Sequence, residues 1–195
     1  DLAAIQSRID KASSVLQETG EGISAADNKE DPLQTANYSC ARDRHSVLTN
    51  KVSTAANNLK ALKSNANKAM AFSAFLSESD KMLSQVQEQK EIIGRRMASV
   101  GNGGFAAESM TSIDTMCRES QASTLESERK SQVLVKGLES LISKAKALEA
   151  EGYDSSTVND PVKRIQDNLS QLSNIIGLEK KQTMFMRKIY IHAKA

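Results

Sequence analysis

The sequence predicts an all-α protein, and three observations support this fold class. The 195 residues include two prolines and nine glycines, too few breakers for short strands joined by tight turns. The composition is rich in Ala, Leu, Glu, Lys, Gln and Ser, which favours long helices. Apolar residues also recur at alternating spacings of three and four, as they do along one face of a helix.

The first helix is expected from the start of the chain to about residue 16. Its apolar stripe comprises Leu2, Ile5, Ile9, Ala12 and Leu16. The segment 18–31, "ETGEGISAADNKED", then interrupts the pattern with two glycines and carries five acids against Lys29. Because glycine and clustered acids both oppose a packed helix, we predict a loop over this segment.

A second, very long helix is predicted from Pro32 to about Val100. Within it only Gly94 opposes a helix, and one glycine need not end it. Two apolar seams follow each other in shifted phase, and one helix whose buried face changes near residue 70 explains both. The first seam is Val52, Ala55, Leu59, Leu62, Ala66 and Ala69, and the second is Phe72, Phe75, Ser79, Met82 and Val86.

Two further helices are expected after the glycine-rich "GNGGF" at 101–105, which predicts a loop. The first runs from about residue 107 to about 151. Its two ends are apolar and its middle seam is polar: Met110, Ile113 and Cys117, then Ser120, Thr124, Ser127 and Ser131, then Leu134, Leu138, Leu141, Ala145 and Leu148. A polar seam packs weakly, so this helix is expected to be loose or bent there. The last seam is Val162, Ile165, Leu169, Leu172 and Ile176, continuing to Met186, Tyr190 and Ala193.

Both prolines of the chain follow an aspartate, at Asp31-Pro32 and Asp160-Pro161. Aspartate is a good N-cap and proline suits the first helical position, so each dipeptide is predicted to start a helix, with Asn159 as a rival cap at the second site. The preceding segments 9–20 and 142–152 also align with each other. We therefore interpret the chain as one helical unit used twice, as in repeat proteins.

At this point the chain resembles the spectrin repeat family. The resemblance is carried by "LISKAKALEAEGYDSSTVNDPVKRIQDNLSQLSNI" at 141–175 and by "AFSAFLSESDKMLSQVQEQ" at 71–89. It implies elongated antiparallel three-helix bundles joined by a continuous helix. Residues 1–68 would be the last two helices of one repeat and residues 69–195 a complete three-helix repeat. The family usually has a tryptophan in the first helix, where this chain has Leu83 or Val86.

The remaining features argue against catalysis and cofactor binding. The net charge of +2 does not indicate a nucleic-acid partner, and no apolar run is long enough to span a membrane. Cys40 and Cys117 match no metal-ligand spacing and are interpreted as free, buried thiols. His45 and His192 have no partner acid at ligand spacing, and "GNGGF" lacks the features of a phosphate loop. We predict no catalytic residues, no cofactor and no metal.

The C-terminal segment "QTMFMRKIYIHAKA" at 182–195 has too many apolar residues for a one-sided stripe, and 179–195 carries five basic residues against Glu179. Two interpretations are open: a joint that continues into a neighbouring repeat, or an amphipathic basic segment that contacts a partner helix, actin or an acidic membrane. The possible partner-binding residues are Met184, Phe185, Met186, Arg187, Lys188 and Tyr190.

The sequence thus predicts a non-enzymatic rod segment of a large cytoskeletal linker, of the kind found in nesprins, plakins or dystrophin relatives. It would act as a spacer and as a docking surface for actin, actin regulators or neighbouring repeats. Its expected location is the cytoplasm and the cytoskeleton, and one such linker would connect the nuclear envelope to the cytoskeleton. The alternative is a helical-bundle adaptor, resembling a talin-like or tethering-complex fragment, that binds partner helices. With no initiator Met, the chain is expected to be a segment of a longer protein.

Overall fold

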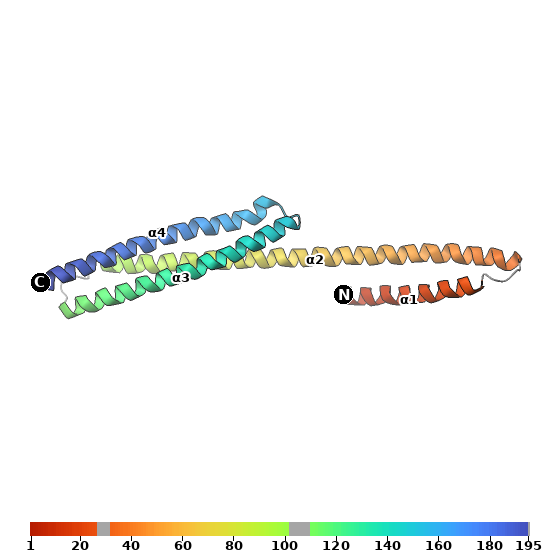
Figure 1. Ribbon diagram of the computed structural model, residues 1–195, viewed down its shortest axis with the longest axis horizontal. Coiled ribbons are helices and arrows are strands. Elements are labelled where there is room, and N and C mark those ends of the chain that lie inside the picture. Colours follow the sequence, from red (N-terminus) through yellow and green to blue (C-terminus); the bar gives the residue numbers. More distant parts are fainter. Residues whose placement is uncertain (27–31, 102–109, 195) are drawn as a thin grey trace. The chain divides into compact units, whose positions relative to one another are not determined.

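The structure, a computed structural model, describes residues 1–26, 32–101 and 110–194, and all regular elements in these ranges are helices (Figure 1). They are α1 (Leu2–Ala26), α2 (Pro32–Gly101), α3 (Met110–Ala150) and α4 (Ser155–Lys194). The all-α prediction is confirmed, and so is the single long helix from Pro32. The predicted "GNGGF" loop falls largely on 102–109, outside the described residues. No described helix has a stretch apolar and long enough to cross a bilayer.

The chain divides into two compact units, Asp1–Met70 (unit 1) and Ala71–Ala195 (unit 2). The boundary falls inside α2, close to residue 70, where the sequence predicts the change of buried face. On the unit 1 side Leu59 is buried, whereas on the unit 2 side Phe75, Ser79 and Val86 are buried. The second seam is therefore confirmed as a buried face. Of the first seam Leu59 is buried and Val52 half-buried, but Ala55, Leu62, Ala66 and Ala69 are exposed, so the prediction that this seam is buried is wrong for those four residues.

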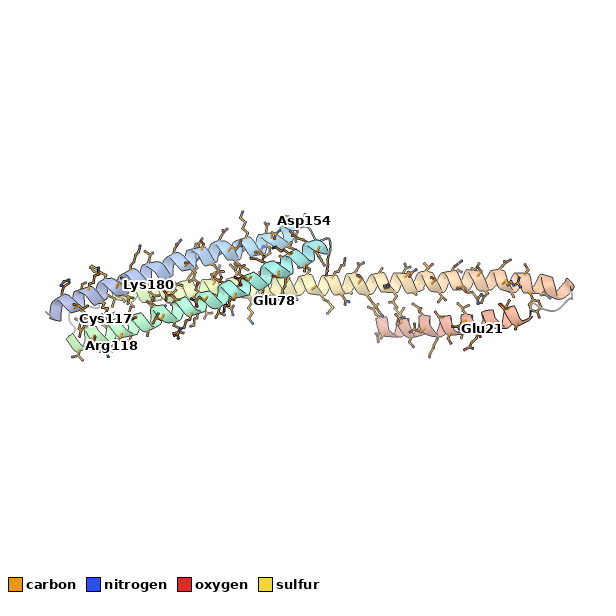
Figure 2. The ribbon with its side chains drawn as sticks, viewed as in Figure 1. Glu21, Glu78, Cys117, Arg118, Asp154 and Lys180 are labelled. Atoms are coloured by element: carbon orange, nitrogen blue, oxygen red, sulfur yellow. The ribbon has the colours of Figure 1, made fainter. Side chains whose placement is uncertain are left out.

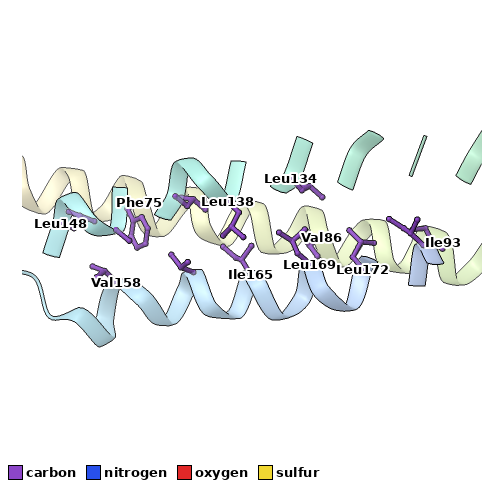
Figure 3. Close-up of a cluster of buried hydrophobic side chains, with 14 residues drawn as sticks. Phe75, Val86, Ile93, Leu134, Leu138, Leu148, Val158, Ile165, Leu169 and Leu172 are labelled. Carbon is purple, nitrogen blue, oxygen red and sulfur yellow. The ribbon is translucent and has the colours of Figure 1, made fainter. Parts of the chain in front are cut away.

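Unit 2 is held together by one apolar core to which three helical segments contribute. Figure 1 shows α3 and α4 running in opposite directions beside the C-terminal part of α2. The core side chains follow the predicted spacing of three and four on α3 and α4 (Figure 3). Each fully buried Leu, Ile, Val or Phe contributes about 1.5–3 kcal/mol. The buried core residues are Phe75, Val86 and Ile93 from α2, Leu134, Leu138, Leu141, Ala145 and Leu148 from α3, and Val158, Val162, Ile165, Leu169, Leu172 and Ile176 from α4.

A tight turn joins α3 to α4 and ends one helix while starting the other. Gly152 has a φ of +96°, a conformation that glycine adopts without strain. Its N–H donates to the Glu149 carbonyl at 2.9 Å, and the Tyr153 N–H donates to the Leu148 carbonyl at 3.1 Å. These two bonds are those of a Schellman C-cap. The ring of Tyr153 then stacks on Phe72, with centroids 4.8 Å apart, which holds the turn against α2.

The predicted start of α4 at Asp160-Pro161 is wrong. The helix begins at Ser155, and Pro161 lies inside it. Asp154 is the cap, because its Oδ2 accepts a hydrogen bond from the Thr157 backbone N–H at 3.1 Å. A proline inside a helix costs roughly 3 kcal/mol. The extra turn buries Val158 completely, worth about 1.5–3 kcal/mol, and the cap adds about 0.5–2 kcal/mol, so together they offset that cost.

This correction makes a direct prediction for the two aspartates. Asp154→Ala is expected to lower the free energy of unfolding by about 0.5–2 kcal/mol, because the Thr157 N–H loses its acceptor. Asp160→Ala, at an exposed position within the helix, is expected to change it by less than about 0.5 kcal/mol. Urea unfolding followed by circular dichroism measures both variants, and equal losses would contradict the assignment of the cap. The corresponding Asp31 lies outside the described residues.

In unit 1, α1 runs beside the N-terminal part of α2 and is longer than predicted (Figure 1). The expected loop over 18–31 is wrong for residues 18–26, which are helical, whereas 27–31 lie outside the described residues. Helix α2 contacts α1 just before this extension, since His45 Nε2 makes a 2.7 Å hydrogen bond with the Leu16 carbonyl. A Cβ on Gly20 would lie 3.0 Å from the His45 ring, so glycine allows the close approach. Segments 9–20 and 142–152 therefore differ in structure, because only the second ends a helix.

Candidate functional site

The predicted docking residues lie on the last three turns of α4, but they do not all face the same way. Phe185 is 63% exposed, and Met184, Arg187 and Lys188 are also exposed. Met186 is 2% exposed and belongs to the core, and Tyr190 is half-buried. The structure therefore brings four of the six residues together at the surface and turns Met186 away from it.

Helix periodicity explains this division. The inward side of α4 continues the core seam with Ile176, Glu179, Thr183 and Met186, at spacings of three and four. Met184, Lys188 and Ile191 follow each other at the same spacings on the outside, and Phe185 adjoins them. Ile189 and Ile191 are exposed as well, although the predicted set omits them. Their signal was present in the sequence, since Ile191 follows Met184 by seven residues. We call Met184, Phe185, Lys188 and Ile191 the α4 stripe.

The charge of this region is concentrated at the exposed face. Glu179, the acid of the segment, is buried, and Lys180 (labelled in Figure 2) pairs with Glu128 of α3 at 2.8 Å. Lys181, Arg187 and Lys188 are exposed beside or within the α4 stripe. A surface that combines exposed apolar side chains with cations is of the kind that contacts acidic partners.

The predicted polar seam of α3 forms a buried polar layer against the part of α4 that precedes the stripe. Thr124 and Ser127 are buried, while Ser120 and Ser131 are half-buried. Thr183 of α4 makes a 2.7 Å hydrogen bond with Ser120. The seam thus faces the bundle interior as predicted, with hydroxyl groups that bond across the helices.

An ion pair between helices completes this layer. Arg96 of α2 contacts the carboxylate of Glu179 at 2.9 Å and donates to Ser127 Oγ at 2.6 Å. Burial raises the pKa of Glu179, and the Arg96 charge only partly opposes this effect. Within the described residues, Glu179 Oε2 and Arg96 Nε are buried without a hydrogen-bond partner. Both side chains line a cavity of about 200 Å³. The layer is an under-satisfied part of the core.

The cysteines and histidines do not assemble into a reactive site. Cys117 is buried, and this burial raises the pKa of its thiol, whereas Cys40 is exposed, so the prediction of two buried thiols is wrong for Cys40. His45 serves the contact between α1 and α2, and His192 is exposed. In the part of the chain that the structure describes, no three His, Cys, Asp or Glu side chains come together as they would around a metal ion.

The α4 stripe and the polar layer are therefore candidates for a functional role. Comparison of the chain with family models, with curated proteins and with solved structures finds no match to any of the three.

Proposed function

We propose that this chain is a non-enzymatic rod segment of a large cytoskeletal linker, in which it acts as a spacer and as a docking surface for actin or actin regulators. Two features of unit 2 support a spectrin-like repeat: the antiparallel packing of three long helical segments around one core, and the capped turn at Gly152–Asp154. On this proposal residues 1–68 belong to one repeat and 69–195 form the next. The linker would lie in the cytoplasm, with the nuclear envelope as one of its attachment points.

The observation that carries the docking role is the α4 stripe. Met184, Phe185 and Ile191 are large apolar side chains that a helix in water gains nothing by exposing. Lys188 lies among these side chains and Arg187 lies beside them. Such a surface can bind an acidic protein surface, which actin filaments provide. A few such apolar and cationic residues suffice to dominate an interface.

Cosedimentation of the full chain with actin filaments tests the proposal. The wild type is expected to sediment with the filaments, and Phe185→Ser/Lys188→Glu is expected to bind at least about tenfold more weakly, since truncating central interface residues commonly costs 2 kcal/mol or more. The matched control is Val133→Ser/Lys136→Glu, which changes an exposed valine and lysine on α3. Binding that is absent in the wild type, or equal in all three proteins, would reject the actin-docking role.

The polar layer favours a second candidate, an adaptor whose helices separate to admit a partner helix. Thr124, Ser127, Glu179 and Thr183 replace apolar contacts at the centre of the bundle, and two buried polar atoms there are unpartnered in the described structure. Such a layer opens at lower cost than an apolar one. The same cosedimentation separates the two functions, because an adaptor with an internal helix-binding site needs no filament.

A further inference from the structure

Unit 1 contains an apolar groove that two helices cannot close. The groove lies between α1 and the N-terminal part of α2 and has a volume of about 480 Å³. Its walls include Ile5 and Ile9 from α1 and Leu48 and Leu62 from α2, and Leu62 is 58% exposed. In the described part of unit 1, Leu59 is the one apolar side chain that is fully buried. Packed helices normally bury a whole stripe, so the described part of this hairpin leaves an apolar face open to another element.

The spacing of the exposed residues defines the shape of the missing element. Along α2 the groove positions Leu48, Val52, Ala55, Leu59 and Leu62 follow each other at four, three, four and three residues. This pattern is the seam onto which another helix packs lengthwise, with apolar residues at i, i+3 or i+4, and i+7. The occupant is therefore an amphipathic helix.

The charges of the groove define the chemistry of that helix. Arg8 and Lys51 are the charged residues that line the groove, and no acid lines it. Among the described residues neither of these cations forms an ion pair. A second copy of the same hairpin would bring two arginines and two lysines into one apolar interface, which is unfavourable. Carboxylates on the occupant would instead pair with both cations.

We propose that the unit 1 groove binds an acidic amphipathic helix of a partner protein. Its apolar stripe would cover Ile5, Leu48 and Leu62, and glutamates or aspartates flanking that stripe would face Arg8 and Lys51. This site is separate from the α4 stripe, and the proposal does not depend on actin binding. It is an alternative to the spectrin-like interpretation of unit 1, in which the first helix of the same repeat would cover this groove.

The test uses the full chain and two fluorescein-labelled synthetic helical peptides of about 21 residues, each carrying a Leu/Ile stripe over three heptads. One peptide has glutamate at the flanking positions and the other has lysine. Fluorescence anisotropy is expected to show the acidic peptide binding at least about tenfold more tightly than the basic one. In Arg8→Glu/Lys51→Glu the preference is expected to reverse.

The matched control is Lys11→Glu/Lys60→Glu, which reverses two exposed cations on the same helices that do not line the groove and is expected to keep the wild-type preference. Three results would overturn the proposal: no peptide binding, equal binding of the two peptides by the wild type, or an unchanged preference in Arg8→Glu/Lys51→Glu. A concentration-dependent dimer that Leu48→Asp abolishes, in sedimentation without peptide, would assign the groove to a second copy instead.

Discussion

Phe75→Ala is expected to lower the free energy of unfolding of the protein by about 3–5 kcal/mol, the largest effect of any single truncation in the core. Phe75 is 1% exposed and is the largest of the fully buried side chains. Its ring lies 6.5 Å from that of Phe72, which in turn stacks on Tyr153 of the turn between α3 and α4. Removing the ring leaves a cavity where all three helical segments meet, and long helices have little freedom to collapse into it.

Urea unfolding followed by circular dichroism measures this loss. Val133→Ala is the matched control, because Val133 is exposed on α3 and its truncation is expected to change the free energy of unfolding by less than about 0.5 kcal/mol. A loss below about 1 kcal/mol for Phe75→Ala would mean that the end of the bundle near the turn is not packed as described.

The second large effect is expected from Arg96→Met. This change removes the cation that faces the buried Glu179 carboxylate, and an uncompensated buried charge typically costs about 3–5 kcal/mol. The expected loss at about pH 7 is close to 3 kcal/mol, the lower end of that range, because the Arg96 side chain is 32% exposed and the pair is partly screened by water.

The pH dependence identifies Glu179 as the cause. Because burial raises the pKa of Glu179 above its ordinary value, the folded state binds this proton more tightly than the unfolded state does. Its contribution to stability is therefore favourable at low pH and is lost as the pH rises through the raised pKa. Arg96→Met removes the charge that lowers this pKa, so Glu179 is protonated at a higher pH in the variant than in the wild type. The loss of stability relative to the wild type should therefore become smaller as the pH is lowered from about 7 to about 5.

A double variant completes the experiment. Arg96→Met/Glu179→Leu replaces both charges by apolar groups and is expected to recover most of the stability that Arg96→Met loses, as buried ion pairs often can be replaced. Glu179→Gln in the wild-type background is expected to abolish the pH dependence that arises from this layer. A loss in Arg96→Met that is independent of pH and persists in the double variant would show that Arg96 acts through its packing rather than its charge.

The candidate site was only partly predictable from the sequence. Periodicity identified an excess of apolar residues at the end of α4, but the predicted set includes Met186, which is buried, and omits Ile191, which is exposed. Assigning these two residues requires the phase of the helix relative to the core, and that phase depends on which side of α4 meets α2 and α3. The unit 1 groove could not be predicted either, because an apolar stripe has the same sequence whether or not it is covered.

By itself, the sequence determined that the chain is helical and which seam α3 and α4 bury in unit 2. The spacing from Leu134 to Leu148 and from Val162 to Ile176 is a local property, because residues three and four apart lie on one face of any helix. Only the tertiary structure decided where α1 ends, where α4 begins and which polar groups meet. Helix α1 continues past Gly20 because His45 of α2 packs there, and α4 starts at Ser155 because burial of Val158 and the Asp154 cap offset the cost of Pro161. The Arg96–Glu179 pair likewise joins residues far apart in the chain. Each of these outcomes balances a weak local preference against contacts from distant segments, and in a folded protein such contacts commonly outweigh local propensity.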